Sequence, residues 1–301
     1  MSSFAVTSDA FVAHAPAKVN LALHVTGRRD DGYHLLDTLV VFTEAGDTVT
    51  ARLAERDTLT IQGRYAQGLA TDSDNLVARA RDLLRRLAGT RPTPAVALDL
   101  DKALPIASGI GGGSSDAAAT LRVLCRVWRL DLDEEVLRRE ALALGADLPM
   151  CLAARPLIAT GIGERLAPVV LPELHMVLAN PGVGVSTPAI FKALQSRENS
   201  PLPPLRATSS MANLVGWLGS TRNDLEHPAM SIAPDIGDVV KTLTANGAAL
   251  ARMSGSGATC FGIFGSQDEA ATAAAAIATA RPTWYVEATR TIEREQIHGA
   301  D

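Results

Sequence analysis

The chain has 301 residues, of which 47% are hydrophobic and 20% are charged, a composition typical of a globular protein with two domains of ordinary size. Its net charge of −5, without any lysine- or arginine-rich run, argues against nucleic-acid partners and against binding to anionic membranes. The three cysteines are widely separated and no signal-peptide pattern or apolar run of about 18–20 residues is present, so we expect a reduced, cytoplasmic protein.

The first half of the chain mixes strand and helix signals. Residues 18–25 alternate between aliphatic and other side chains, so we expect Lys18 and Asn20 on one face of a strand and aliphatic residues on the other. Apolar residues at helical spacing predict three helices. The predicted elements are strands over 18–25, 38–42 and 96–100 and helices over 76–87, 115–128 and 137–144.

The second half has the order strand, helix, strand, strand, helix, strand, once inserted helices are set aside. This order is that of the ferredoxin-like plait. The predicted elements are strands over 174–179, 249–253, 259–264 and 284–288, a helix that begins at Thr187-Pro188, and helices over 236–243 and 267–280. We place the domain boundary within 154–163 and divide the chain into residues 1–160 and 161–301.

The sharpest sequence feature is a glycine-rich segment that opens directly into an alanine-rich helix. It comprises Pro105, Ile106, Ala107, Ser108, Gly109, Ile110, Gly111, Gly112, Gly113, Ser114 and Ser115. Glycines let a backbone approach an anion, and a helix start offers unpaired N–H groups. A tight turn with a serine cap is the simpler alternative, but four glycines followed by two serines exceed what a cap requires. We predict a phosphate-binding loop, in which a side chain at Gly112 would block the phosphates.

Two common phosphate-binding motifs do not fit this segment. A Walker A motif requires a lysine before the serine, whereas these glycines run straight into Ser114. A dinucleotide fingerprint requires a third glycine at that position and follows the first strand of its domain, so a nicotinamide oxidoreductase is disfavoured. A second glycine-rich segment, residues 254–257, lies between two predicted strands. It is either a hairpin turn or a second anion-binding loop.

Three further segments make the pattern specific. Residues 15–21 (APAKVNL), 145–149 (GADLP) and 252–258 (RMSGSGA), together with the loop, resemble the motifs of the GHMP kinase superfamily. The resemblance covers nearly the whole chain and implies an α+β fold of two domains. The N-terminal α/β domain would resemble ribosomal protein S5, and the C-terminal domain would be the ferredoxin-like plait. It also implies ATP and Mg²⁺ as cofactors and a monomer or weak homodimer.

The resemblance assigns chemical roles to two residues. Asp147 would be the base that accepts the proton of the acceptor hydroxyl, and Lys18 would neutralise charge on that hydroxyl or on the γ-phosphate. Without the resemblance, Asp147 could equally be a turn residue between a helix and a strand. Lys18 could be a solvated strand lysine, although a bare lysine within an apolar strand is costly.

The acceptor is implied by further segments, residues 31–36, 188–191 and 222–226, which resemble a branch of the superfamily that phosphorylates a cytidine-diphosphate-linked alcohol. The implied substrate-binding residues are Asn20, Tyr33, His34, Phe191, Gly255, Ser256 and Gly257. In this reading Tyr33 and Phe191 sandwich the cytosine, and His34 reads its edge. Spacing alone would assign Phe191 to core packing.

Two other readings stay open from the sequence. One is a sibling kinase for mevalonate, homoserine or a sugar, which Tyr33, His34 and Phe191 argue against. The other is a catalytically silent nucleotide-binding module, which an intact Lys18 and Asp147 argue against. The sequence assigns no metal ligands.

Overall fold

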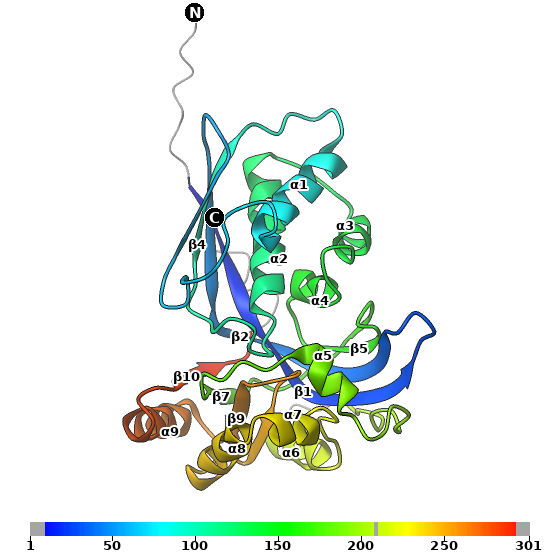
Figure 1. Cartoon of the computed structure of the whole chain (residues 1–301), viewed down its shortest axis with the longest axis vertical. Coiled ribbons are helices and arrows are strands. Elements are labelled where there is room, and N and C mark those ends of the chain that lie inside the picture. Colours follow the sequence, from blue (N-terminus) through cyan, green and yellow to red (C-terminus); the bar gives the residue numbers. More distant parts are fainter. Residues whose placement is uncertain (1–9, 208–209, 293–301) are drawn as a thin grey trace, which may run out of the picture.

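The structure, a computed structural model, describes residues 10–207 and 210–292 and arranges them in two lobes, each built on a β-sheet (Figure 1). Helices and strands mix in both lobes, which confirms the predicted α+β class. Within the described residues, no helix is long and apolar enough to cross a bilayer.

The first lobe contains a six-stranded sheet with helices on one face (Figure 1). The sheet order is β3-β4-β2-β5-β6, and β1 pairs antiparallel with β2. Its strands are β1 (Phe11–Arg28), β2 (His34–Leu53), β3 (Thr58–Gln62), β4 (Val96–Asp101), β5 (Leu157–Gly161) and β6 (Arg165–Pro168); its helices are α1 (Leu76–Ala88), α2 (Gly112–Val127), α3 (Glu134–Ala141) and α4 (Leu148–Ala153).

Local sequence explains where the two long helices begin. The Asn75 side chain accepts a hydrogen bond from the Val77 backbone and caps α1, as expected for an asparagine at that position. The helix α2 follows Gly111, which has a φ of +66° that favours glycine. Its early residues Ala117, Ala118 and Ala119 are fully buried, because only small side chains let this helix pack closely on β1.

The second lobe is the predicted ferredoxin-like plait. Its antiparallel sheet has the order β10-β7-β9-β8, with helices on one face. The strands are β7 (His175–Asn180), β8 (Leu250–Met253), β9 (Cys260–Phe264) and β10 (Tyr285–Arg290), and the plait helices are α8 (Asp235–Ala245) and α9 (Gln267–Ala280). Three short helices are inserted between β7 and α8: α5 (Thr187–Lys192), α6 (Met211–Gly219) and α7 (Glu226–Ile232).

The lobes share a hydrophobic core, and as a result both faces of β1 are buried. Val19, Leu21 and Leu39 from the first sheet join Leu178 and Phe261 from the second sheet in one buried cluster. Every residue from Ala15 to Val25 is buried. The predicted common face of Lys18 and Asn20 is confirmed, because their side chains are hydrogen-bonded to each other. The alternation does not continue to residue 25, since a register shift between β1 and β2 after Asn20 interrupts the two-residue period.

The strand pairing also bears on the predicted domain boundary. A division after residue 160 falls inside β5, and β6 still pairs with β5 in the first sheet. We therefore propose the boundary within 169–174, since the earlier position would separate two hydrogen-bonded strands.

Candidate active site

The two glycine-rich segments lie against each other where the lobes meet. Gly109 has a φ of +78°, and a Cβ atom there would lie 2.5 Å from the carbonyl oxygen of Ser254 and 2.7 Å from the backbone nitrogen of Gly257. The Ser254 hydroxyl donates to the Gly109 carbonyl at 3.0 Å, and the Thr259 amide donates to the Ser108 carbonyl at 3.0 Å. The two segments, far apart in the sequence, thus form one backbone surface.

Lys18 runs across the first of these loops. Its backbone amide donates to the Ile110 carbonyl at 2.9 Å. A Cβ atom at Gly111 would lie 3.1 Å from both Cβ and Cε of Lys18, so a glycine at this position leaves room for the lysine stem. The loop then continues into the first turn of α2, whose unpaired N–H groups and positive dipole end favour an anion.

Two residues of the predicted loop have side chains that point away from its open face. The Ser115 hydroxyl donates to the Pro16 carbonyl at 2.7 Å, and the side chains of Ser115 and Ile110 are completely buried. These side chains hold the loop onto β1 and the core, so any contact of these two residues with a nucleotide would be made by their backbone. Ser114 differs, because it lines the cavity that also contains Asp147.

The predicted catalytic pair is present. The Lys18 ammonium lies 3.3 Å from Asp147 Oδ2 and donates to Asn20 Oδ1 at 2.9 Å. The Lys18 side chain is 5% exposed, whereas that of Asp147, just before α4, is 41% exposed. A buried cation therefore faces a carboxylate that stays accessible to a hydroxyl group.

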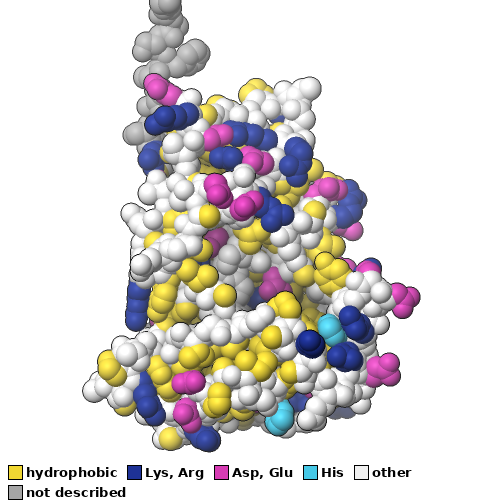
Figure 2. Space-filling model, viewed as in Figure 1, with side chains coloured by type: hydrophobic (Ala, Val, Ile, Leu, Met, Phe, Trp, Pro, Cys, Tyr) yellow, Lys and Arg dark blue, Asp and Glu magenta, His cyan; other side chains and the backbone are white. Residues whose placement is uncertain are grey.

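Three cavities adjoin one another in this region. The middle one, of about 390 Å³, is lined by both Lys18 and Asp147. It shares Gly112 and Gly113 with a smaller cavity of about 310 Å³ beside the start of α1. It shares Asp147 and Phe191 with a larger one of about 760 Å³. The space-filling view shows the molecule hollowed across this region, with apolar side chains along the hollow (Figure 2).

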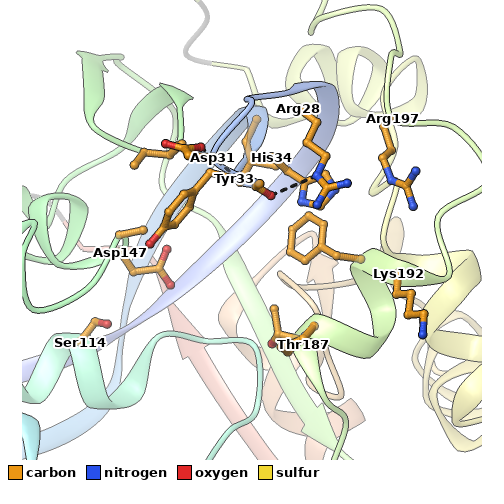
Figure 3. Close-up of a pocket in the computed structure, with 15 residues that line it drawn as sticks. Arg28, Asp31, Tyr33, His34, Ser114, Asp147, Thr187, Lys192 and Arg197 are labelled. Carbon is orange, nitrogen blue, oxygen red and sulfur yellow. Dashed lines mark hydrogen bonds between the residues drawn. The ribbon is translucent and has the colours of Figure 1, made fainter.

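The large cavity has an acidic side and a basic side. Asp147 and Ser114 stand on one side, and Arg28, Lys192 and Arg197 on the other (Figure 3). No sequence motif had singled out these three cations, although Lys192 directly follows Phe191.

The aromatic residues are arranged differently from the predicted sandwich. The His34 ring stacks on Phe191, with centroids 4.4 Å apart and planes inclined by 20°. Tyr33 is 57% exposed and lies on the Asp147 side of the cavity (Figure 3). Burial, then the neighbouring Arg28 and Arg197 charges, lower the pKa of His34, so its ring is neutral at neutral pH and can both donate and accept a hydrogen bond.

Known proteins resemble this chain over almost its full length. Models of the GHMP kinases N terminal domain and of the GHMP kinases C terminal match residues 75–155 and 192–282. A 4-diphosphocytidyl-2-C-methyl-D-erythritol kinase of Mesorhizobium japonicum is 54% identical over 283 residues, which cover 94% of this chain and 96% of that protein. The chain belongs to this family of GHMP kinases. It is an ATP-dependent small-molecule kinase, as the sequence predicted.

Solved structures agree with this assignment. A crystal structure of a 4-(cytidine 5'-diphospho)-2C-methyl-D-erythritol kinase matches with a TM-score of 0.77 and 34% identity, covering 93% of this chain and 99% of that one. A homoserine kinase from Cytophaga hutchinsonii matches with a TM-score of 0.68 at 20% identity, covering 97% of this chain and 98% of that one, which shows a shared fold alone.

A buried ionic cluster beneath the loop of this kinase escaped sequence analysis. The Lys102 ammonium donates to Asp47 and, at 2.9 Å, to Asp116 Oδ2. Asp47 also accepts from the backbone amides of Ala103 and Leu104, at 2.7 and 2.8 Å. Asp116 lies in the second turn of α2, next to the loop. The cluster therefore ties β2, the end of β4 and α2 together under the glycine-rich loop.

The cluster holds two carboxyl groups for one cation. Burial, opposed by Lys102 and supported by Asp47, raises the pKa of Asp116 to about 8. Burial alone would lower the pKa of Lys102, but the Asp116 and Asp47 carboxylates outweigh it and raise that pKa. Because its pKa is raised, Asp116 keeps its proton to a higher pH than a free aspartate does, which eases the packing of two carboxyl groups against one ammonium.

We expect this proton to make stability depend on pH. Asp116 has a pKa of about 8 in the folded chain and an ordinary value of 3.8, so the folded chain binds more protons between these values. Its contribution to the free energy of unfolding is complete below about pH 4 and is lost as the pH rises through about 8. Asp116→Asn removes this dependence, so the stability of the variant relative to the unaltered chain should grow from pH 5 to pH 8. Urea unfolding at several pH values gives the free energy of unfolding of both chains. A difference between the two that stays constant from pH 5 to pH 8 would contradict the expectation.

The loop contact generates a second expectation, which adds Gly109 to the earlier prediction for Gly112. A Cβ at Gly112 would meet Lys102 Nζ at 3.4 Å, an ordinary contact, whereas one at Gly109 would strike backbone. Gly109→Ala should therefore weaken ATP binding by at least about tenfold, because the loop must move. Gly89→Ala is a matched control, since Gly89 also has a positive φ but open space around it. Calorimetric ATP affinities that are equal in the two variants would refute this expectation.

Proposed function

We propose that this chain transfers the γ-phosphoryl group of ATP to the 2-hydroxyl of 4-diphosphocytidyl-2-C-methyl-D-erythritol, a step of the non-mevalonate route to isoprenoid precursors. The observation that carries the proposal is a line of three cavities, in which the middle one contains both Lys18 and Asp147 and adjoins the small one at Gly112 and the large one at Asp147. Two ligands could enter this line of cavities from opposite ends and meet in the middle cavity. The names of the Mesorhizobium relative and of the matching crystal structure supply the acceptor. We place this activity in the cytoplasm, in a monomer or weak homodimer.

The loop and the small cavity suit ATP. Gly109 and Gly111 are positions where a side chain would fill the cradle or strike its neighbours, so the backbone can approach the phosphates. The small cavity, lined by Asn75, Leu76 and Lys102 among others, would receive the nucleoside end. These residues supply the adenine contacts that the sequence did not assign.

Magnesium would enter this site together with ATP. Among the described residues, no group of three or more histidine, cysteine, aspartate or glutamate side chains could hold a metal ion. Mg²⁺ typically combines one or two protein oxygens with substrate phosphates, and Ser114 and Asp147 line one cavity and fit that need. Bound there, the ion would neutralise charge on the β- and γ-phosphates.

Lys18 and Asp147 divide the chemistry between them. The acceptor oxygen forms a bond to the γ-phosphorus, the bond from that phosphorus to the β–γ bridging oxygen breaks, and the hydroxyl proton passes to the Asp147 carboxylate. Lys18 keeps its charge and balances the negative charge that builds up between the two ligands. Its burial leaves it little freedom to turn to solvent, so its position is fixed before the substrates meet.

The large cavity suits the cytidyl acceptor. Its 760 Å³ exceed what a small alcohol such as homoserine would fill, and its rings offer stacking surfaces for a base. We assign cytosine binding to Tyr33, His34 and Phe191. For the diphosphate we assign Gly255 and Ser256, which line the middle cavity, with the nearby Lys192 as a counter-charge. Gly257 lies outside the lining of these cavities, next to Ser256, and its backbone faces Gly109 in the contact between the two glycine-rich segments.

Replacement of the proposed base tests the mechanism. Asp147→Asn should lower kcat by at least about 100-fold while ATP still binds, because the amide cannot take up the proton. Asp82→Asn is a matched control: Asp82 is 45% exposed and pairs with Arg81, but lies on α1 away from the cavities. Coupled ADP release measures both variants in the presence of Mg²⁺. A kcat near that of the unaltered chain in Asp147→Asn would remove Asp147 from the mechanism.

Replacement of the rings tests the acceptor. Tyr33→Ala and Phe191→Ala should each raise KM for the cytidyl substrate by an amount worth about 1–3 kcal/mol and leave KM for ATP unchanged. The two effects should be non-additive if both rings contact one base. The same assay on mevalonate, homoserine and galactose should show negligible turnover. A better rate with any of these alcohols would overturn the named acceptor and preserve the kinase assignment.

A further inference from the structure

Behind the Lys18–Asp147 pair, polar side chains form a hydrogen-bonded chain that ends on the backbone of β1. The Lys18 ammonium donates to Asn20 Oδ1, and Asn20 Nδ2 donates to Thr38 Oγ1 at 2.8 Å. The Thr38 hydroxyl donates to the Ala22 carbonyl at 2.6 Å. Thr38 lies on β2 and is 1% exposed, so water does not compete for these bonds.

The carbonyl at the end fixes the direction of every bond in this chain. A carbonyl oxygen only accepts, so Thr38 must give its single hydroxyl proton to Ala22. The Thr38 oxygen can then only accept, which turns the amide nitrogen of Asn20 toward it. The amide oxygen of Asn20 is thereby turned toward the Lys18 ammonium. The opposite orientation would place two donors, NH₂ and NH₃⁺, against each other.

An irregularity in β1 anchors this arrangement. The pairing of β1 with β2 shifts register between Asn20 and Ala22 and leaves Leu21 without a partner in the ladder. The Leu21 carbonyl instead accepts from Arg252 at 2.8 Å, and the backbone N–H of Asn20 donates to Ser254 Oγ at 3.0 Å. Residues of the second lobe thus satisfy the backbone on both sides of the bulge and hold Asn20 in place.

We propose that Thr38 is a positioning residue for phosphoryl transfer, which orients the Asn20 amide and through it holds the Lys18 ammonium beside Asp147. Without the hydroxyl, the amide is free to turn its nitrogen toward Lys18, and the ammonium loses its one neutral acceptor. The remaining partner, Asp147, is much more exposed and is needed for the proton. The inference rests on the roles of Lys18 and Asp147 proposed above.

The test replaces the hydroxyl with a methyl group of similar shape. Thr38→Val should lower kcat by about 10- to 100-fold, because a displacement of about 1 Å at a reacting group has effects of this size. KM for ATP and for the acceptor should stay within about threefold, since valine keeps the shape of Thr38 in the lining of the middle cavity. Thr38→Ser, which keeps the hydroxyl, should restore kcat to within about threefold of the unaltered chain.

Thr43→Val is the matched control. Thr43 lies on the same strand, is fully buried, and donates its hydroxyl to the Ala45 carbonyl at 3.0 Å. Its replacement removes a comparable buried hydrogen bond without reaching Lys18, so kcat should not change. Thermal unfolding of each variant records the loss of stability separately from the loss of rate.

A double-mutant cycle separates positioning from a general structural effect. Because Thr38 acts through Asn20, Thr38→Val should change kcat by less than about twofold in an Asn20→Ala background. Three results would overturn the inference. They are an unchanged kcat in Thr38→Val, a loss of kcat in Thr43→Val as large as that in Thr38→Val, or a loss of kcat on adding Thr38→Val to Asn20→Ala as large as in the otherwise unaltered chain.

Two provisions keep the test decisive. Should Thr38→Val fail to fold, Thr38→Ala compared with Thr38→Ser provides the same contrast. The unaltered chain is assayed first, and the variants are compared on the alcohol it phosphorylates fastest. If that alcohol is not the cytidyl substrate, the proposed substrate is overturned, but the kcat values of the Thr38 variants can still be compared.

Discussion

A buried ammonium group needs partners that cannot move away, and this requirement organises the centre of the molecule. Lys18 is placed by its backbone bond to the first glycine-rich loop, by the space that Gly111 leaves, and by the side-chain amide of Asn20. Asp147, brought by the start of α4, supplies the opposite charge. Desolvating one cation without these groups would cost several kcal/mol. Strand β1, the loop and α4 therefore have to be assembled together before the site exists.

The contact between the two glycine-rich segments has a geometric role. Because backbone touches backbone at Gly109, the distance between the lobes is set by main-chain atoms rather than by adjustable side chains. The shared core of β1, β2 and the second sheet supports the same alignment. The proposed ATP site and acceptor site belong to different parts of the chain, and this interface is what would bring their reacting atoms together.

Much of this architecture was readable from the sequence, and the exceptions have physical causes. The plait order, the capped helix α1 and the glycine loop depend on local patterns, and the structure contains all three. The bulges of β1 depend on pairing with β2 and on the second lobe, so no local period reveals them. The Lys102 cluster likewise joins residues that only the sheet brings together. The stacking of His34 on Phe191 arises from two lobes meeting, which spacing along either segment cannot predict.

The interlocked glycines also limit how this kinase can change over evolution. A Cβ at Gly109 would strike the carbonyl of Ser254, and one at Gly255 would strike the carbonyl of Gly109 at 2.7 Å. In an ordinary core, a neighbour can become smaller and compensate for a larger residue. Here the obstructing atoms belong to the main chain, which is the same for every amino acid, so no replacement can make them smaller. Second mutations that compensate for a substitution at either glycine should consequently be rare. Sequence change in these segments should occur at the residues around Gly109 and Gly255 and not at the two glycines themselves.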